Sequence, residues 1–203
     1  MTFKEYFAWF KRDWAKAGLL VSIFLFAFLF VLVKDSDFVL FLLLLQTPLY
    51  MLHQAEEYIF PGGFGKFFNM DIMKFDTPDK PLDENFILAI NIVLIWIILP
   101  FFGLLAAKNY VYGLWIPYFS FFAGLAHIAL GIKARKRYNA GLVVSLLLNI
   151  PVGAWSVLYL VNQGLLPNIF LNPHFFIGLG LNLALPVIGM VKYKQHLREI
   201  SAS

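Results

Sequence analysis

Residues able to do proton or metal chemistry stand inside an apolar run at His53-Gln-Ala-Glu56-Glu57. On a helix, the two carboxylates follow His53 by three and four residues, so both flank the face that carries the imidazole. Ionisable groups are expensive inside a membrane and usually serve a function there. Because Glu56 and Glu57 point about 100° apart around a helix axis, we expect one to be an acid or a ligand and the other to orient a partner or reach the headgroups. The structural alternative is that Glu57 snorkels to the interface while His53 bonds a carbonyl.

A second histidine and three amides lie at a comparable depth in other apolar segments. His53 is about five residues, roughly 7–8 Å, from the end of its segment, and His127 is about six residues, roughly 9 Å, from the end of its own. Asn91 falls at a similar level, and Asn149 and Asn182 lie somewhat deeper. We therefore predict a shared site, although His127 and the deeper amides also suit hydrogen bonds between helices. The predicted catalytic residues and metal ligands are His53, Glu56, Glu57 and His127, and the predicted substrate contacts are Asn91, Asn149, Trp155 and Asn182.

Composition indicates that these residues belong to a membrane protein. Hydrophobic residues make up 61% of the 203 residues, charged residues make up 14%, and the mean hydropathy is +0.75, values outside the range of soluble domains. A helix of about 20 apolar residues spans the hydrocarbon core. We predict an all-α integral membrane protein, a single domain over residues 1–203 that forms a bundle of six transmembrane helices. The predicted spans lie near residues 17–33, 38–58, 86–106, 112–132, 140–162 and 173–191.

Two flanking segments mix aromatic and charged residues. In residues 2–16, Phe3, Phe7, Phe10 and Trp14 recur at helical spacing against lysines and an arginine, which predicts an N-terminal interfacial helix. Residues 62–80 follow a Pro-Gly-Gly helix stop and combine phenylalanines with lysine and aspartate. This second segment either covers the mouth of the site or is a connector adsorbed to the membrane.

The distribution of basic residues predicts the orientation of the helices. Of the 16 Lys and Arg residues, 14 fall on one side of the predicted membrane, and the loops on the other side hold only Lys34 and Lys108. Cytoplasmic loops carry the excess of Lys and Arg. We therefore expect both termini in the cytoplasm, an inner (cell) membrane location, and the His/Glu site in the cytoplasmic leaflet. Basic loops beside anionic lipid explain the net charge of +4 without a nucleic acid partner.

The motif resembles that of a known family. His53, Glu56 and Glu57, at the end of a predicted span and followed by Phe60-Pro-Gly-Gly63, resemble the signature of the H-x-x-E-E family of small multi-pass membrane proteins. The resemblance implies a family that covers most of the chain, and it implies no reaction, because the family has no established activity. The chemistry is also similar to that of the sterol isomerase type of membrane enzyme, which moves a proton across an isoprenoid double bond. This sequence lacks the further intramembrane acidic residue that those enzymes use.

Two classes of function fit these residues. The first is an intramembrane enzyme that acts on a lipophilic substrate, such as a lipid or isoprenoid, by acid–base chemistry or through a bound divalent metal. Because the chain has no cysteine, nitrogen and oxygen atoms would ligate the metal, and Zn²⁺ or Fe²⁺ suits such ligands. The second is a proton-coupled transporter or lipid-binding protein. We favour the enzyme, with membrane lipids and a lipophilic small molecule as partners, because the polar groups gather on one side of the membrane.

The predicted orientation can be tested with single cysteines, because the chain has no thiol of its own. We expect a membrane-impermeant thiol reagent, applied to intact cells, to label Lys34→Cys and Gln163→Cys but not Arg135→Cys. The charge asymmetry is the reason for this expectation. Labelling of Arg135→Cys alone would show that the orientation is reversed.

Overall fold

The computed structural model describes residues 2–202, without the side chains of residues 199, 200 and 202, and every regular element in this range is a helix. Six helical stretches are long and apolar enough to cross a membrane. The predicted all-α fold class is confirmed, and each predicted span overlaps one of these stretches. Their bounds are Phe3–Val33, Phe38–Tyr58, Glu84–Leu105, Tyr110–Ala134, Leu142–Asn162 and Pro173–Arg198.

Several of these stretches change from α-helix to π-helix along their length. The elements in chain order are α1 (Phe3–Phe28), η1 (Leu29–Val33), α2 (Phe38–Tyr58), α3 (Phe64–Lys66), η2 (Phe67–Ile72), α4 (Glu84–Asn91), η3 (Ile92–Ile98), α5 (Leu99–Leu105), η4 (Tyr110–Tyr112), α6 (Ile116–Ala134), α7 (Leu142–Val144), η5 (Ser145–Asn149), α8 (Ile150–Asn162) and α9 (Pro173–Ala202). The π segments η3 and η5 each end two residues before a proline, Pro100 and Pro151. Proline lacks an N–H and clashes with the carbonyl one turn earlier, and a wider turn gives that carbonyl another donor.

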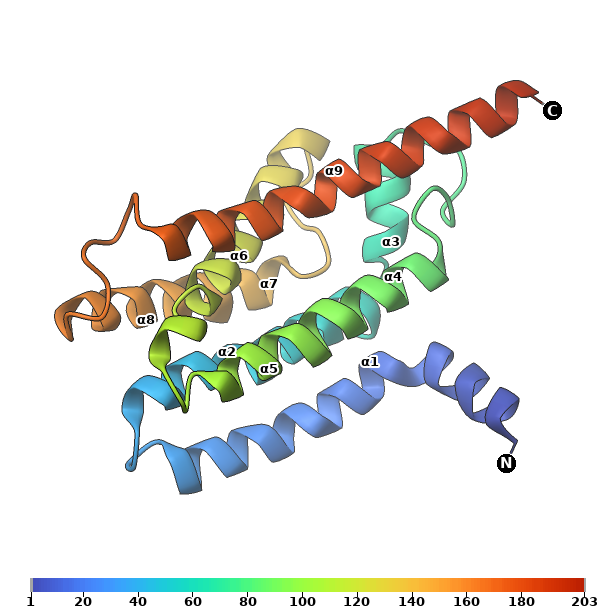
Figure 1. Cartoon of the computed structure of the whole chain (residues 1–203). Coiled ribbons are helices and arrows are strands. Elements are labelled where there is room, and N and C mark those ends of the chain that lie inside the picture. Colours follow the sequence, from blue (N-terminus) through green and yellow to red (C-terminus); the bar gives the residue numbers. More distant parts are fainter. Residues whose placement is uncertain (1, 203) are drawn as a thin grey trace.

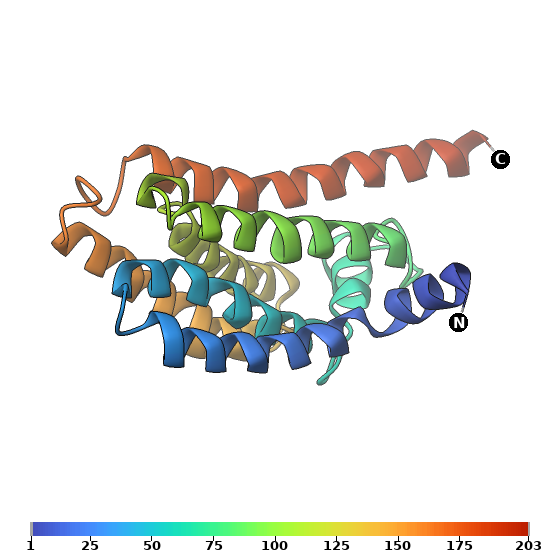
Figure 2. The ribbon, with the colours of Figure 1, turned by 60° about the horizontal axis from the view of Figure 1, so that its bottom comes forward.

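Helix α2 lies at the centre of the bundle. In its most apolar window, 78% of the residues are buried, against 56% for the stretch that contains α6 and 11% for that of α9. Figures 1 and 2 show α1 along one side of the bundle and α9 along another. The side chain of Asp37 fixes the start of α2, since it accepts a hydrogen bond from the Leu40 backbone N–H at 2.9 Å and from the Tyr110 hydroxyl at 2.9 Å.

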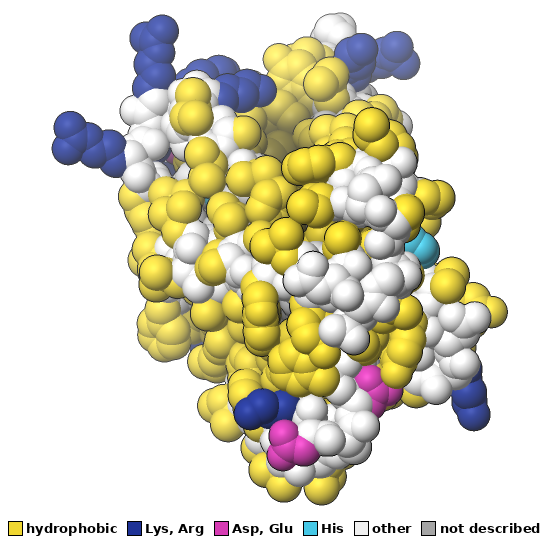
Figure 3. Space-filling view, turned by 90° about the vertical axis from the view of Figure 1, so that its left-hand side faces the viewer, with side chains coloured by type: hydrophobic (Ala, Val, Ile, Leu, Met, Phe, Trp, Pro, Cys, Tyr) yellow, Lys and Arg dark blue, Asp and Glu magenta, His cyan; other side chains and the backbone are white. Residues whose placement is uncertain are grey.

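The start of α1 and the end of α9 lie at the same end of the molecule (Figure 1), as an even number of spans requires. The opposite end carries the turns near residues 34–37, 106–115 and 163–172. Few charged side chains are visible on that end (Figure 3), in agreement with the low charge of these loops in the sequence.

The predicted interfacial segment 2–16 is helical, but it is continuous with the first span rather than a separate helix. Figure 1 shows a bend that separates the two parts of α1. Phe3 and Phe7 are exposed, whereas Trp14 and Ala15 are buried against Leu88 of α4. The second half of this segment therefore helps to fix α1 against the bundle.

Helix α9 packs closely on α6 at a glycine, Gly178. A Cβ atom at Gly178 would lie 2.6 Å from the Tyr118 Cβ and 2.8 Å from the Phe119 backbone nitrogen, whereas a Cβ at Gly180 meets nothing within 4 Å. Small residues allow such close contact between spanning helices. The two positions, two residues apart on one helix, form a matched pair for mutagenesis.

We expect Gly178→Val to lower the free energy of unfolding in detergent by roughly 1–3 kcal/mol, because the added methyl groups force α9 away from α6. Gly180→Val should cost less than about 0.5 kcal/mol. Denaturant titration of both variants checks this. Equal losses would mean that α9 does not pack on α6 through Gly178.

Candidate metal centre

Three buried side chains from two helices converge near one end of the bundle. The Nε2 atom of His53 lies 3.5 Å from the Oε1 atom of Glu57, and the Nε2 atom of His127 lies 3.4 Å from the same oxygen. The two imidazole rings meet nearly at right angles, with their centroids 4.6 Å apart. His53 and Glu57 stand one turn apart on α2, and α6 brings His127 to them. Each of the three residues offers one possible ligand atom, and these three atoms lie within 4.8 Å of one another.

Hydrogen bonds to Asn139 fix the orientation of the His127 ring and the proton on its Nδ1 atom. Its Nδ1 atom is 2.7 Å from the Oδ1 atom of Asn139, and the Asn139 amide nitrogen donates to the backbone carbonyl of His127 at 3.0 Å. Because a carbonyl only accepts, the amide of Asn139 has one possible orientation, and its Oδ1 atom accepts the Nδ1 proton of His127. The Nε2 atom of His127 is then the ring nitrogen that faces the Glu57 carboxylate, 3.4 Å away.

A serine hydroxyl plays the corresponding role for His53. The Ser145 hydroxyl donates to the Gly141 carbonyl at 2.6 Å, so its oxygen is left to accept from the Nδ1 atom of His53, 3.4 Å away. The Nε2 atom of His53 is fully buried and has no hydrogen-bond partner among the described residues. It too faces the Glu57 carboxylate, at 3.5 Å.

With both imidazoles neutral, the three groups form a cluster of acceptors without a donor. Two imidazole lone pairs and a carboxylate repel one another in a low-dielectric interior, and a cation between them removes the repulsion. Ligand atoms around a tetrahedral Zn²⁺ are about 3.3 Å apart, close to the 3.4 and 3.5 Å found between the histidine nitrogens and the Glu57 oxygen. The residues therefore fit a divalent metal ion, with Asn139 and Ser145 as the outer partners that orient the ligands.

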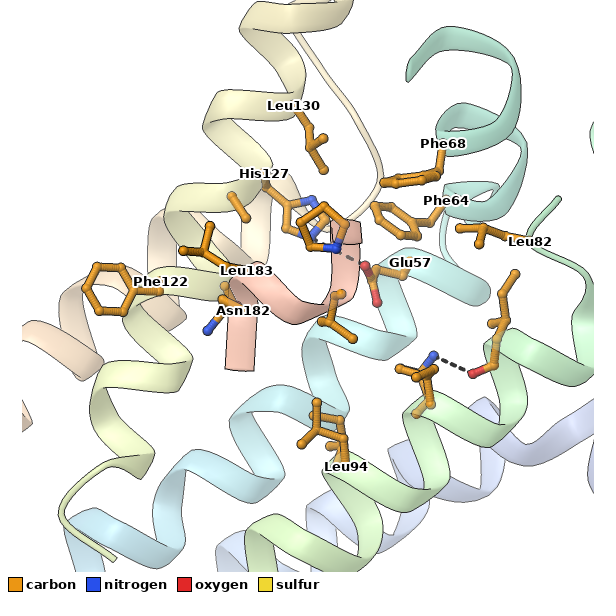
Figure 4. A pocket seen from close by; sticks show the side chains of 18 of the residues that line it. Glu57, Phe64, Phe68, Leu82, Leu94, Phe122, His127, Leu130, Asn182 and Leu183 are labelled. Carbon is orange, nitrogen blue, oxygen red and sulfur yellow. Dashed lines mark hydrogen bonds and ion pairs between the residues drawn. The ribbon is translucent and has the colours of Figure 1, made fainter. Parts of the chain in front are cut away.

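The cluster borders a large apolar cavity. The cavity has a volume of about 470 Å³ and lies between α2, α4, α6, α9 and the segment of α3 and η2. Figure 4 shows Glu57 and His127 in its wall, with Phe64 and Phe68 on one side and Asn182 and Leu183 across from them. The segment 62–80 therefore contributes part of the cavity wall through Phe64 and Phe68.

Comparison with known protein families identifies the central part of the chain. A family model described as a protein of unknown function with HXXEE motif matches residues 44–156. This range covers more than half of the chain and contains all three members of the cluster together with Asn139 and Ser145. The chain belongs to the HXXEE family. No curated protein and no solved structure matches it.

The first glutamate of the HXXEE motif, Glu56, lies outside the cluster. The Glu56 carboxylate accepts hydrogen bonds from the backbone N–H groups of Val143 and Val144, at 3.0 and 2.7 Å, and from the Tyr138 hydroxyl at 3.0 Å. Burial and the nearby Glu56 carboxylate raise the pKa of the Tyr138 phenol to about 12, so the phenol keeps its proton and remains a donor. Glu56 therefore caps α7 and holds the loop that carries Asn139, while Glu57 alone supplies a carboxylate to the cluster.

The predicted substrate contacts of the HXXEE protein divide into two groups. Asn91 and Asn182 line the cavity. Asn149 is fully buried and donates to the Ser120 hydroxyl at 3.1 Å, so it joins η5 to α6. Trp155 is 48% exposed on α8 and contacts the ring of Phe38, so the structure does not bring it to the cluster.

Three partners of the cluster were missed in the sequence, namely Asn139, Gly141 and Ser145. Asn139 and Gly141 lie in the turn after α6, and Ser145 is the first residue of η5; in the sequence this segment reads as a loop and the start of a span. The Asn139-Ala-Gly141 sequence does mark a turn, but nothing in its spacing indicates contact with residues near position 53. Gly141 has a φ of +101°, and a Cβ there would lie 2.5 Å from the Cε1 atom of His127 and 2.8 Å from that of His53.

We expect Gly141→Ala to destabilise the protein by roughly 2–4 kcal/mol, since it combines a strained positive φ with a clash against both imidazoles. It should also weaken Zn²⁺ binding, because the rings must separate. Gly164→Ala is the control, since Gly164 has a φ of +70° with nothing within 4 Å of a Cβ. The control should lose only about 1–2 kcal/mol and keep its metal affinity, as measured by unfolding and by metal titration. Equal effects of the two substitutions on metal binding would contradict the proposed packing of Gly141.

Proposed function

We propose that this HXXEE protein is a metal-dependent intramembrane enzyme that acts on a lipophilic substrate. The observation that carries the proposal is the convergence of two imidazole nitrogens and a carboxylate oxygen beside an apolar cavity. His53, Glu57 and His127 would ligate Zn²⁺ or Fe²⁺. Glu56 would act through the loop that it holds.

The distances favour a metal over a shared proton. A charge-assisted hydrogen bond between a nitrogen and a carboxylate oxygen is typically about 2.7–2.9 Å long. The His53–Glu57 and His127–Glu57 contacts are longer, at 3.5 and 3.4 Å, and match neighbouring ligands of one ion. A metal also offsets the cost of an ionised carboxylate in the membrane interior.

Three protein ligands favour a catalytic ion over a structural one. Structural zinc sites use four protein ligands, whereas catalytic sites use three and keep one position for water or substrate. Glu57 and His127 border the cavity, so the remaining position would face it. An ion there would polarise an oxygen atom of the substrate or of a bound water.

The cavity wall supports a substrate that enters from the bilayer. Apolar residues form most of the wall, and among them Leu125 and Leu183 are 38% and 55% exposed on the outer surface of the helix bundle. An opening edged by exposed leucines suits lipid chains better than water. Membrane lipids or isoprenoids are therefore the proposed substrates, and the charge asymmetry of the loops supports an inner membrane with the site in its cytoplasmic leaflet.

A proton-coupled transporter is the second candidate, and one observation favours it. The side-chain oxygens of three fully or nearly buried residues in the spans have no hydrogen-bond partner among the described residues, namely those of Gln46, Thr47 and Asn149. Such groups suit a line of internal waters that could carry protons. Uptake of protons into vesicles that contain the purified protein would support this candidate, provided that Glu57→Gln abolished it.

The metal is tested by elemental analysis of the purified protein and of two neighbouring variants. We expect about one Zn or Fe per chain in the wild type and in Glu56→Gln, but none in Glu57→Gln. Loss of one of three ligands should lower the metal affinity by about two orders of magnitude or more. Glu56→Gln is the matched control, because it removes an equal charge one residue away; it should lower only the melting temperature.

Activity is tested by incubating the metal-loaded protein with total membrane lipids and comparing the lipid profiles by mass spectrometry. A product that appears with the wild type and not with Glu57→Gln would support the enzyme. A wild type that neither contains nor binds a divalent metal would contradict the metal centre, and a metal-loaded protein that leaves the lipids unchanged would contradict the enzyme.

A further inference from the structure

We infer that the Tyr58 hydroxyl is an oriented hydrogen-bond donor in the cavity, which selects lipophilic molecules that carry an uncharged oxygen acceptor. The inference deepens the proposed function, because it names the class of substrate that the same cavity takes. It is carried by a chain of hydrogen bonds whose direction is fixed at both ends.

Trp96 fixes the direction of the hydrogen bonds at one end of the chain. The Trp96 Nε1 atom donates to the Gln54 Oε1 atom at 3.1 Å, and an indole N–H can only donate. The Gln54 amide therefore turns its nitrogen the other way, where it donates to the Asn91 Oδ1 atom at 2.8 Å. With its oxygen taken by Gln54, Asn91 has only its amide nitrogen left for further bonds.

The other end of the chain gives the same direction independently. The Asn91 amide nitrogen donates to the Ile87 backbone carbonyl at 2.8 Å, which can only accept, and to the Tyr58 hydroxyl oxygen at 3.2 Å. The Tyr58 oxygen is thus an acceptor in this bond, and its own proton points elsewhere. No residue that the structure describes accepts that proton.

The Tyr58 ring cannot easily turn away from the cavity. It packs against Trp14, with ring centroids 5.0 Å apart, and meets the edge of Phe64 at 6.4 Å. Tyr58 lines the cavity and directly follows Glu57 at the end of α2. A molecule bound in the cavity therefore contacts a residue whose phenol proton no described residue accepts.

The amides of the cavity wall offer no such donor. Both protons of Asn91 are committed to Ile87 and Tyr58, and the Asn182 amide nitrogen donates to the carbonyls of Phe119 and Gly178. Asn91 is therefore a positioning residue for Tyr58, rather than the direct substrate contact predicted from the sequence. An apolar cavity with one oriented donor discriminates by the presence of an acceptor, as sites built around a buried hydrogen bond do.

Tyr50 provides a control within the same cavity. Its ring also lines the cavity, and its hydroxyl has no hydrogen-bond partner among the described residues. It lies eight residues earlier on α2, about 12 Å along the helix axis, and no neighbouring amide orients it. If Tyr58 is the selective donor, removing the Tyr50 hydroxyl has little effect on selection.

The probes are a long-chain methyl ketone and the alkane of the same length. Each displaces a brominated alkane from the full-length protein in detergent, and the recovery of tryptophan fluorescence reports the displacement, since Trp14 packs directly on Tyr58. We expect the wild type to prefer the ketone by roughly three- to tenfold, the effect of one hydrogen bond. Tyr58→Phe should bind both equally, and Asn91→Leu should lower the preference without abolishing it.

Tyr50→Phe and the exposed Tyr112→Phe should keep the full preference. A preference that survives in Tyr58→Phe, or that is lost in Tyr50→Phe instead, overturns the inference, as does a wild type that binds ketone and alkane equally. The metal content of each sample separates this result from the proposed function. Tyr58→Phe should keep the wild-type metal content, and a metal-free wild type that still prefers the ketone would contradict the metal centre alone.

Discussion

The arrangement of this protein depends on three acceptor atoms that face one another in a buried site. When both imidazoles are neutral, with their Nδ1 protons engaged elsewhere, the two rings and the carboxylate repel one another, and an unpaired charge in such a site costs several kcal/mol. The surrounding contacts act to keep this costly arrangement rather than to relieve it. Asn139 and Ser145 hold the two rings with their Nε2 atoms inward, so the repulsion is built into the fold and a cation is the natural complement.

The turn between α6 and α8 builds this arrangement. It supplies Asn139 to His127, Ser145 to His53, and Gly141 to the narrow space beside both rings. The π segment η5, which lies before Pro151, carries Ser145 inward. Glu56 ties the turn back to α2 by accepting two backbone N–H groups. The adjacent glutamates of the motif thus have different roles. Glu57 belongs to the cluster, and Glu56 holds the segment that surrounds it.

The proposed ion and the cavity together would define a site for an amphipathic molecule. The apolar wall accommodates chains or rings, and the polar groups gather at one side of it, where Glu57, Tyr58 and His127 lie. Within that group, Glu57 and His127 are acceptors and Tyr58 is a donor. The Tyr58 phenol would bind an oxygen atom of the substrate, and the ion would polarise a neighbouring bond. Substrate selection would then depend on Tyr58, whereas the chemistry would depend on the ligands Glu57 and His127.

The sequence by itself determined the membrane class, the six helices, and the stretch of α2 that carries His53 and the two candidate glutamates. Hydropathy and helix periodicity are local properties, and residues one turn apart on a helix must face the same way whatever surrounds them. It also placed His127 at the depth of His53, because rise per residue converts sequence distance into depth. Depth does not give direction around the helix axis, so Asn91, Asn182 and Trp155 looked equivalent although only the two amides border the cavity.

Only the tertiary structure decided which glutamate joins the histidines and what the other one does. Glu56 and Glu57 are adjacent and chemically alike, and their roles differ because α7 presents its N-terminal N–H groups to one and α6 presents His127 to the other. The direction of the hydrogen bonds that end at Tyr58 likewise required contacts between α2 and the stretch of α4 and η3. These contacts join residues about 30–90 positions apart in the sequence, and no local pattern specifies such pairs, since they arise from helix packing.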